Sequence, residues 1–420
     1  MTAGFQRSGA PPKVLLATYG SVGDVRPIAA LGQVLQSRGL RIGVCAPPDS
    51  RELIAAQDLP FIPLGGNVRK LMQAHARRLV ARPLAAAVPM THLLRRELAL
   101  QFRQLPEVVA GADLVVGSGL ALAVSSVAEA CGVPYTYAVS MPLLVPSRCH
   151  APLTVPWQNL PPLCNRMLWW MAAGVLDLGY RSLLNRCRQR LGLTPLAHLM
   201  PHLTANMTVA ADRELAPLPP EAPPDCRQTG YWHSAPRDQP LPVEVEGFLG
   251  KKPKPIYIGF GSMGDPAPQR TIAVLRQAVR RSGQRAIIQS GWAGWTFNSD
   301  AHCLCVPYAL PHDRLFCRVA AAVHHGGAGT VMTAARAGIP QALVPHLLDQ
   351  YYWGRRVQQL GIGPQPLDRK RLDVDRLTRT FERLAGSAAL RAKARDLAAP
   401  LRRRDGVGEA ARWIVERIGG

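Results

Sequence analysis

The feature that most constrains the fold is a strand–turn–helix unit that occurs in both halves of the chain. An apolar run at 14–18 predicts a buried strand, and the turn at 20–24 leads into a helix with Pro27 in its first turn. A second apolar strand at 41–46 follows that helix directly, which is the pattern of a parallel sheet. Another such unit begins at 256–262. The sequence therefore predicts two α/β domains.

The remaining pattern agrees with two domains. The chain has 420 residues, and single cores stop growing at roughly 250–300. Ten prolines between 217 and 255 leave little room for a helix there and indicate a linker in the later part of that stretch. Further strands are expected at 114–117 and 134–139 in the first half, and at 286–289, 304–307, 321–324 and 341–344 in the second.

The run His324-His325-Gly326-Gly327-Ala328-Gly329-Thr330 follows an apolar strand and opens a helical stretch. Three glycines let the backbone approach a ligand closely, and the free amides of a helix start attract anions. A diphosphate fits this description. The spacing is neither the Gly-x-Gly-x-x-Gly of dinucleotide-binding proteins nor a P-loop, which would end in Gly-Lys-Ser/Thr. A tight turn alone would need the glycines but not the paired histidines or the threonine.

Charge and cysteine content limit the classes of protein that need considering. The formal charge of +22 attracts anions in general, but no RNA-binding motif or zinc-finger spacing accompanies it, so nucleic acid is not expected as a partner. Nine scattered cysteines form no disulfide framework, and no signal-peptide core is present near the start. The longest apolar stretch, 167–176, is about half the roughly 20 residues that span a membrane. A cytoplasmic protein is expected.

These motifs resemble those of the GT-B glycosyltransferases that include the antibiotic and sterol glucosyltransferases. The likeness rests on the 324–330 run, Ala-Gly-Ile-Pro at 337–340 and Asp349-Gln350, and it extends to the opening strand with Gly23-Asp24-Val25-Arg26-Pro27 and to Pro63-Leu64-Gly65-Gly66-Asn67. The segments 256–263, 289–292 and 353–364 continue it. The resemblance implies two Rossmann-like domains facing across a cleft: an acceptor-binding domain at 1–235, a linker at 236–255, a nucleotide-sugar-binding domain at 256–400, and a C-terminal helix at 401–420 that packs back on the first domain.

The resemblance also implies roles for individual residues. The donor diphosphate would be bound by the first histidine and the glycine-rich amides, and Ser262 would add a hydroxyl to the same phosphates. Asp349 and Gln350 would hold sugar hydroxyls, and backbone atoms near Val306 would meet the nucleobase. The residues assigned to the diphosphate loop are His324, Gly326, Gly327, Gly329 and Thr330.

Asp24 matches the position of the carboxylate that activates the acceptor in this branch of the family. A hydroxyl that attacks an anomeric carbon needs a base for its proton, and a loop carboxylate can serve. The alternative is that Asp24 is only a helix N-cap. Asp373-Val374-Asp375 looks like a metal-binding Asp-x-Asp, but it precedes a helix near Arg376, where capping is the ordinary explanation. We therefore expect no metal site and no cofactor, only a nucleotide-sugar co-substrate.

The expected reaction is inverting transfer of a hexose, glucose first, from UDP-glucose or alternatively a dTDP-sugar to a hydroxyl of a lipophilic acceptor such as a sterol, hopanoid or polyketide aglycone. The alternatives are a non-catalytic partner protein and a sugar-nucleotide epimerase. Between 69 and 103 the chain has eight basic residues and one acidic residue. This segment predicts that the protein binds peripherally to the inner face of a membrane that contains anionic lipid. A solvated helix face explains them equally well. Trp169-Trp170 are expected in the core or around an apolar acceptor, and the protein is expected to be a monomer or dimer.

Overall fold

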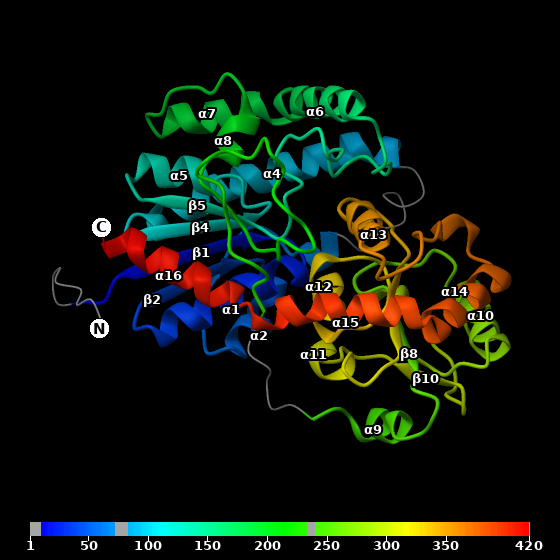
Figure 1. Cartoon of the computed structure of the whole chain (residues 1–420). Coiled ribbons are helices and arrows are strands. Elements are labelled where there is room, and N and C mark those ends of the chain that lie inside the picture. The colour runs from blue at the N-terminus through cyan, green and yellow to red at the C-terminus, as the bar shows by residue number, and fades with distance from the viewer. Residues whose placement is uncertain (1–9, 72–82, 234–239, 420) are drawn as a thin grey trace.

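A computed structural model of the chain describes residues 10–71, 83–233 and 240–419. Two parallel sheets, each flanked by helices, organise the described chain (Figure 1). The first is seven-stranded, in the order β3-β2-β1-β4-β5-β6-β7. The second is five-stranded, in the order β10-β9-β8-β11-β12. In each sheet the first strand of its domain lies inside the sheet and is paired on both sides, as expected for doubly wound α/β domains.

The strands of the first sheet are β1 (Lys13–Tyr19), β2 (Arg41–Ala46), β3 (Phe61–Pro63), β4 (Leu114–Gly119), β5 (Tyr135–Val139), β6 (Met207–Val209) and β7 (Arg227–Gln228). The helices of this half are α1 (Val22–Ser37), α2 (Arg51–Ala55), α4 (Pro83–Val109), α5 (Val124–Ala130), α6 (Pro162–Leu176), α7 (Ser182–Arg190) and α8 (Leu199–Thr204). A π-helical turn, η2 (Asp177–Arg181), joins α6 to α7.

The second sheet comprises β8 (Ile256–Gly259), β9 (Ala286–Gln289), β10 (Cys303–Val306), β11 (Ala321–His324) and β12 (Gln341–Leu343). Its helices are α10 (Pro268–Arg281), α11 (His312–Leu315), α12 (Ala328–Ala337), α13 (Gln350–Gln359), α14 (Val374–Gly386) and α15 (Ala388–Arg403). A short helix, α9 (Val243–Leu249), precedes the sheet, and α16 (Gly406–Gly419) ends the described chain.

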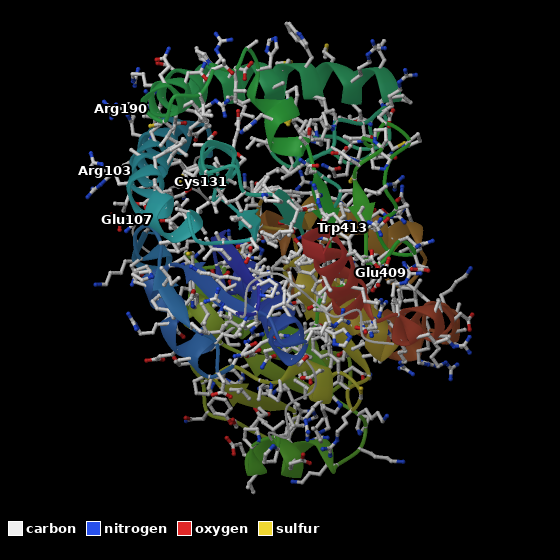
Figure 2. All side chains as sticks on the ribbon, turned by 90° about the vertical axis from the view of Figure 1, so that its left-hand side faces the viewer. Arg103, Glu107, Cys131, Arg190, Glu409 and Trp413 are labelled. Atoms are coloured by element: carbon white, nitrogen blue, oxygen red, sulfur yellow. The ribbon has the colours of Figure 1, made fainter. Side chains whose placement is uncertain are left out.

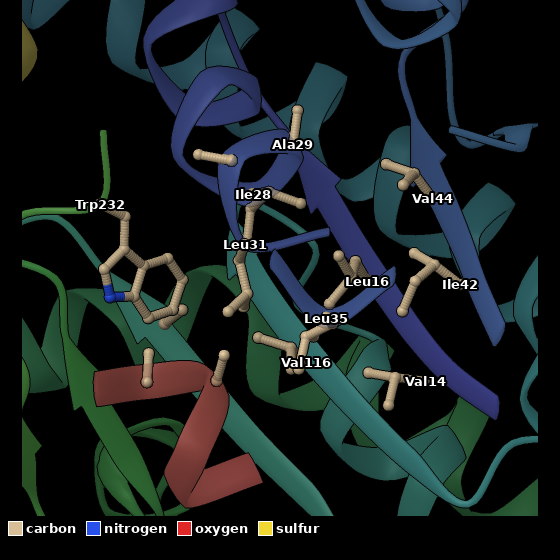
Figure 3. Close-up of a cluster of buried hydrophobic side chains, with 14 of the residues drawn as sticks. Val14, Leu16, Ile28, Ala29, Leu31, Leu35, Ile42, Val44, Val116 and Trp232 are labelled. Atoms are coloured by element: carbon tan, nitrogen blue, oxygen red, sulfur yellow. The ribbon is translucent and has the colours of Figure 1, made fainter. Parts of the chain in front are cut away.

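The core of the first half lies on both faces of its sheet. On one face α1 packs on β1, β2 and β4 through Ile28, Leu31 and Leu35, as Figure 3 shows. The C-terminal helix α16 returns to this same face, where Ile414 joins the cluster. The other face is covered by α4, α5 and α7. The inner strands β1, β2, β4, β5 and β6 are buried along most of their length and are largely apolar, as parallel strands covered on both faces require, whereas the edge strands β3 and β7 are partly exposed.

The two halves share a third cluster. Val139 and Val209 at the ends of β5 and β6 pack with Val331 of α12, Trp353 of α13 and Leu401 of α15. An ion pair joins the halves beside this cluster, since Arg336 Nη1 lies 3.9 Å from the fully buried carboxylate of Asp212. The two sheets are therefore connected by a packed interface.

Two local expectations were wrong. Pro27 lies in the second turn of α1 rather than the first, because Ser21 caps the helix and starts it at Val22. The proline-rich stretch contains the helix α9 at Val243–Leu249, which begins directly after Pro242. A proline before the first helical residue costs no hydrogen bond, since the first amides of a helix have no partner within it. The described helices include none that is long and apolar enough to cross a membrane.

Candidate active site

The loops that follow β8, β9 and β11 meet at one edge of the second sheet. Gly261, after β8, accepts a hydrogen bond from the Trp292 backbone N–H at 3.0 Å. A Cβ on Gly261 would lie 2.8 Å from the ring of His325, and one on Gly291 would lie 2.4 Å from the Gly261 carbonyl oxygen. Parallel strands bring their carboxyl ends to the same edge, and the register pairs His324 with Gly259. The crowding leaves room only for glycine at these positions.

The start of α12 offers unpaired backbone donors at this edge. Gly327 is the N-cap residue and has no side chain to cap the helix. The amides of the first turn, at 328–330, therefore have no capping partner from that position, while the Val331 N–H already bonds to the Gly327 carbonyl at 3.0 Å. Thr330 in that turn and Ser262 in the loop after β8 are both half-buried. Helix-start amides with nearby hydroxyls form an arrangement suited to an anion.

Gly326 fixes the path of the loop. Its φ of +96° lies in the region that favours glycine, and a Cβ there would meet Leu343 Cδ2 at 2.8 Å and the Gln350 carbonyl oxygen at 3.2 Å. The loop after β11 is thus packed directly against the first residue of α13. The sequence prediction placed the 324–330 run and Asp349-Gln350 at one site, and the structure brings them together.

His324 is fully buried and both of its ring nitrogens are engaged. Nδ1 accepts the Gly326 N–H at 3.1 Å, and Nε2 donates to Gln341 Oε1 at 3.0 Å. Burial and the neighbouring His325 lower the pKa of His324 to about 3, so the ring is neutral at neutral pH. In this arrangement His324 holds the loop in shape and occupies the Gly326 amide. Direct contact of either group with a diphosphate stays a prediction.

His325 is the half-buried member of the pair, and the sequence prediction did not include it. Its ring lies between Gly261 and Gly327, whose Cβ positions would be 2.8 and 2.6 Å from it. Its Nδ1 atom is buried and makes no hydrogen bond with the described residues. Burial lowers its pKa to about 4. Successive side chains along an extended strand point to opposite sides. This alternation could have shown from the sequence that His324 and His325, at the end of β11, do not both point into the protein.

Gln350 and Asp349 differ in the same way. Gln350 is buried, and its Oε1 accepts the N–H groups of His346 and Leu347 at 2.7 and 3.2 Å. Its Nε2 lies 3.5 Å from Met263 Sδ in the loop after β8. Gln350 therefore braces two loops, and its contact with a sugar stays a prediction. Asp349 is half-buried, beside Leu348, whose φ of +52° is rare for a residue other than glycine.

Asp24 stands on the other domain, near enough for its charge to act on this carboxylate. Its Oδ2 accepts the Ser21 N–H at 2.8 Å and lies 3.2 Å from the Ser21 hydroxyl, which closes a capping box at the start of α1. Ser21 is therefore the N-cap, and Asp24 is its partner in the first turn. Partial burial raises the pKa of Asp24. Burial, followed by the nearby charge of Asp24, raises the pKa of Asp349 to about 7.

Val306 and the Asp-x-Asp motif at 373–375 are the remaining positions considered from the sequence, and each makes local hydrogen bonds or ion pairs. Val306, the last residue of β10, is buried, and its carbonyl accepts the Ser290 N–H at 2.9 Å. Asp373 accepts the Arg376 N–H at 2.8 Å and caps α14, as expected, and Asp375 pairs with Arg281 at 2.5 Å.

No group of three or more His, Cys, Asp or Glu residues in the described chain could hold a metal ion. A hollow of about 370 Å³ opens between the loop at 156–159 and α13.

Family models match both halves of the chain. Residues 14–147 match the N-terminal domain of glycosyltransferase family 28, and residues 305–413 match the C-terminal domain of erythromycin biosynthesis protein CIII-like proteins. The second match contains the loop at 324–330, Asp349 and the start of α13, and the first contains Asp24. Asp24 and Asp349 thus lie in two separately recognised domains.

Individual relatives of the chain are glycosyltransferases as well. Glycosyltransferase GtfE of Amycolatopsis orientalis is 39% identical over 386 residues, which is 90% of this chain and 89% of the relative. The vancomycin aglycone glucosyltransferase of the same organism is 36% identical over 97% of this chain and 98% of its own. A sterol 3-beta-glucosyltransferase of Arabidopsis thaliana is 28% identical over 97% of this chain and 66% of its own.

A solved structure agrees with the fold. The glycosyltransferase of kitacinnamycin superposes with a TM-score of 0.75, covering 97% of this chain and 99% of the other at 17% identity. At that identity the likeness shows the fold alone, which is the GT-B arrangement of two parallel-sheet domains facing across a cleft. Taken with the two domain matches and the relatives above 30% identity, these findings show that the chain belongs to the GT-B glycosyltransferases of the family that includes the glycopeptide-antibiotic and sterol glucosyltransferases.

Proposed function

We propose that this glycosyltransferase moves a hexose, glucose first, from a nucleotide sugar to a hydroxyl of a lipophilic acceptor, with inversion at the anomeric carbon. UDP-glucose is the proposed donor, and a dTDP-sugar is the alternative. The acceptor is proposed to be a sterol, a hopanoid or a polyketide aglycone. The names of a vancomycin aglycone glucosyltransferase and a sterol 3-beta-glucosyltransferase among the relatives support glucose as the sugar, and the second name supports a sterol as the acceptor.

The observation that carries the proposal is the approach of Asp24 to Asp349. They belong to different domains, yet the charge of Asp24 raises the pKa of Asp349. An acceptor hydroxyl beside Asp24 would therefore lie close to a sugar held at Asp349. The hydroxyl proton passes to the Asp24 carboxylate as the oxygen bonds to the anomeric carbon, and the nucleoside diphosphate leaves with the electron pair. The raised pKa makes Asp24 a stronger base than an ordinary aspartate.

The donor is proposed to lie over the start of α12. The amides of the first turn, with Ser262, Thr330 and the half-buried His325, would bind the diphosphate and stabilise its charge as it leaves. His324 and Gln350 would hold the loops in place from beneath through the hydrogen bonds described above. Amides and hydroxyls fixed before the reaction supply the charge stabilisation for which other glycosyltransferases use a metal ion, so the proposed reaction needs none.

The test is a matrix of donors and acceptors. Purified protein is incubated with UDP- and dTDP-sugars against sterols, hopanoids and macrolide-like aglycones, with and without EDTA, and products are identified by mass spectrometry. We expect a monoglycoside of one acceptor class from UDP-glucose, unchanged by EDTA. Transfer from dTDP-sugars only would overturn the assignment of the nucleotide. Conversion of the free donor without an acceptor would indicate an epimerase instead.

A further inference from the structure

The outward face of α6 and η2 is an apolar stripe. Six of the thirteen large hydrophobic side chains that are exposed among the described residues lie on this one segment. They are Leu163, Met167, Trp170, Met171, Val175 and Leu178, with exposed fractions from 50% to 86%. Their spacing of three, four or seven residues places most of them on one side of the helix. We call these six residues the α6 stripe.

The inward face already accounts for the stability of this helix. Trp169 is buried and donates its indole N–H to the His150 carbonyl at 3.0 Å, and Asn165 donates to the Arg148 carbonyl at 2.8 Å. Trp169 and Trp170 thus divide between the core and the surface. The fold does not need the α6 stripe to be apolar, since polar residues would serve equally on an exposed helix face. A contiguous exposed apolar face of this kind marks an interaction surface.

The charges around the α6 stripe are almost all positive. Between 130 and 211 the only acidic residue is Asp177, and its carboxylate already accepts hydrogen bonds from His198 and the Leu199 N–H, both at 2.9 Å. The basic side chains that are exposed on α6, η2 and α7 are Arg166, Arg181, Arg186 and Arg190. An apolar face of Trp, Leu and Met with arginines beside it is the composition of helices that lie in the headgroup region of anionic membranes.

The location of α6 and α7 suits contact with an extended surface. They form the outermost layer at the top of Figure 1, on the side of the first domain away from α9, and Arg190 projects from that layer in Figure 2. Beneath them, Arg95 of α4 donates to the Gly179 carbonyl at 3.3 Å, and Leu98 and Phe102 are buried. Part of α4 is therefore packed under this layer, whereas Arg69, Lys70, Arg96 and Arg103 of the basic segment 69–103 are exposed, and residues 72–82 of that segment lie outside the described residues.

We propose that the α6 stripe, with the arginines beside it, docks this protein on the surface of a membrane that contains anionic lipid. The apolar side chains enter the headgroup boundary while the arginines meet lipid phosphates, and the helix lies in the plane of the surface. Charge complementarity selects this occupant over a second copy of the chain, because two copies would bring the same four arginines together. The inference goes beyond sugar transfer and does not depend on it.

The experiment is flotation of the full chain with vesicles of phosphatidylcholine alone or with 30% phosphatidylglycerol (roughly the anionic content that attracts basic segments). We expect binding to the anionic vesicles that weakens as salt is raised. Trp170→Ser with Leu178→Ser lowers the partition coefficient at least about tenfold, since fully burying one such side chain is worth about that factor. Arg166→Gln with Arg181→Gln lowers it about fivefold per arginine.

Matched controls lie at the far end of the molecule. Val243→Ser removes an equally exposed apolar side chain from α9, and Lys252→Gln with Lys254→Gln removes two exposed charges; neither should change binding. The stripe variants should keep the wild-type Tm, because the side chains they change are 78% and 86% exposed. The proposal is overturned if the wild-type chain ignores anionic vesicles, if the stripe variants bind equally well, or if the wild type is a dimer in solution that the stripe variants dissociate.

Discussion

At the scale of single residues, the two histidines after β11 have separate tasks although they are neighbours in sequence. His324 is neutral and bonded on both sides within the protein, whereas His325 is half-buried between the loops after β8 and β11. Gln350 and Asp349 divide in the same way, with the buried residue bracing loops and the half-buried one facing Asp24. Each pair of adjacent polar residues thus supplies one support and one group that can meet the donor.

This division predicts opposite phenotypes for the two histidines. His325→Ala should weaken binding of the nucleoside diphosphate about tenfold, the value of roughly one strong hydrogen bond to a charged group, with little change in stability. His324→Ala should lower the free energy of unfolding by about 2–4 kcal/mol, since it leaves a cavity and removes the partner of Gln341 Oε1. Calorimetric titration and chemical denaturation measure the two effects. Equal losses of binding with unchanged stability would contradict the division.

The pair of carboxylates predicts a shifted titration. Asp349 should titrate near pH 7, with its charged form present above that value and its neutral form below it. In Asp24→Asn the pKa of Asp349 should fall, because the negative charge that disfavours its ionisation is gone, but it should stay above its ordinary value because burial remains. NMR of carboxyl-labelled aspartate follows this directly. An unchanged Asp349 titration would mean that the two groups do not face each other.

At the scale of elements, the donor loop depends on backbone geometry that only glycine provides. Gly326→Ala should abolish donor binding and destabilise the protein, because the Cβ would lie 2.8 Å from Leu343 in addition to the unfavourable φ. Gly39→Ala is the matched control: its φ is +87°, but no atom lies within 4 Å. That control should cost only the conformational strain, about 1–2 kcal/mol, and leave donor binding intact. Denaturation and titration of both variants check this.

The elements that the sequence predicted best are the buried strands. Those at 286–289 and 321–324 were located to the residue, because short apolar runs bounded by turn residues have few other structures available. The helix α9 was missed because proline was taken as excluding helix rather than as starting one. The motif located the candidate site, but it could not show that His324 and Gln350 are saturated by partners such as Gln341 and His346, which are contacts formed only on folding.

At the scale of the whole molecule, the two domains are joined by a shared core and a buried charge. Asp212 is fully buried, and its ion pair with Arg336 links the segment after β6 to α12 across the interface. Arg336→Gln should lower the free energy of unfolding by about 1–3 kcal/mol, because it removes one of the two cations near the buried Asp212 carboxylate and leaves only Arg404. Arg318→Gln, which breaks an exposed pair with Glu246, is the control and should cost under about 1 kcal/mol. Similar Tm values for the two variants would exclude this role.

The two joined domains would divide the proposed reaction between them. The C-terminal domain would hold the donor over the start of α12, and the N-terminal domain would supply the base. The most direct test is the configuration of the product together with the effect of Asp24→Asn. From an α-linked nucleotide sugar we expect a β-linked glycoside by proton NMR, and a kcat lowered at least about 100-fold in Asp24→Asn with donor binding kept. Asp373→Asn, which alters an exposed aspartate that caps α14 and has no role in the proposed reaction, should transfer sugar normally. An α-linked product, or normal transfer by Asp24→Asn, would contradict the account.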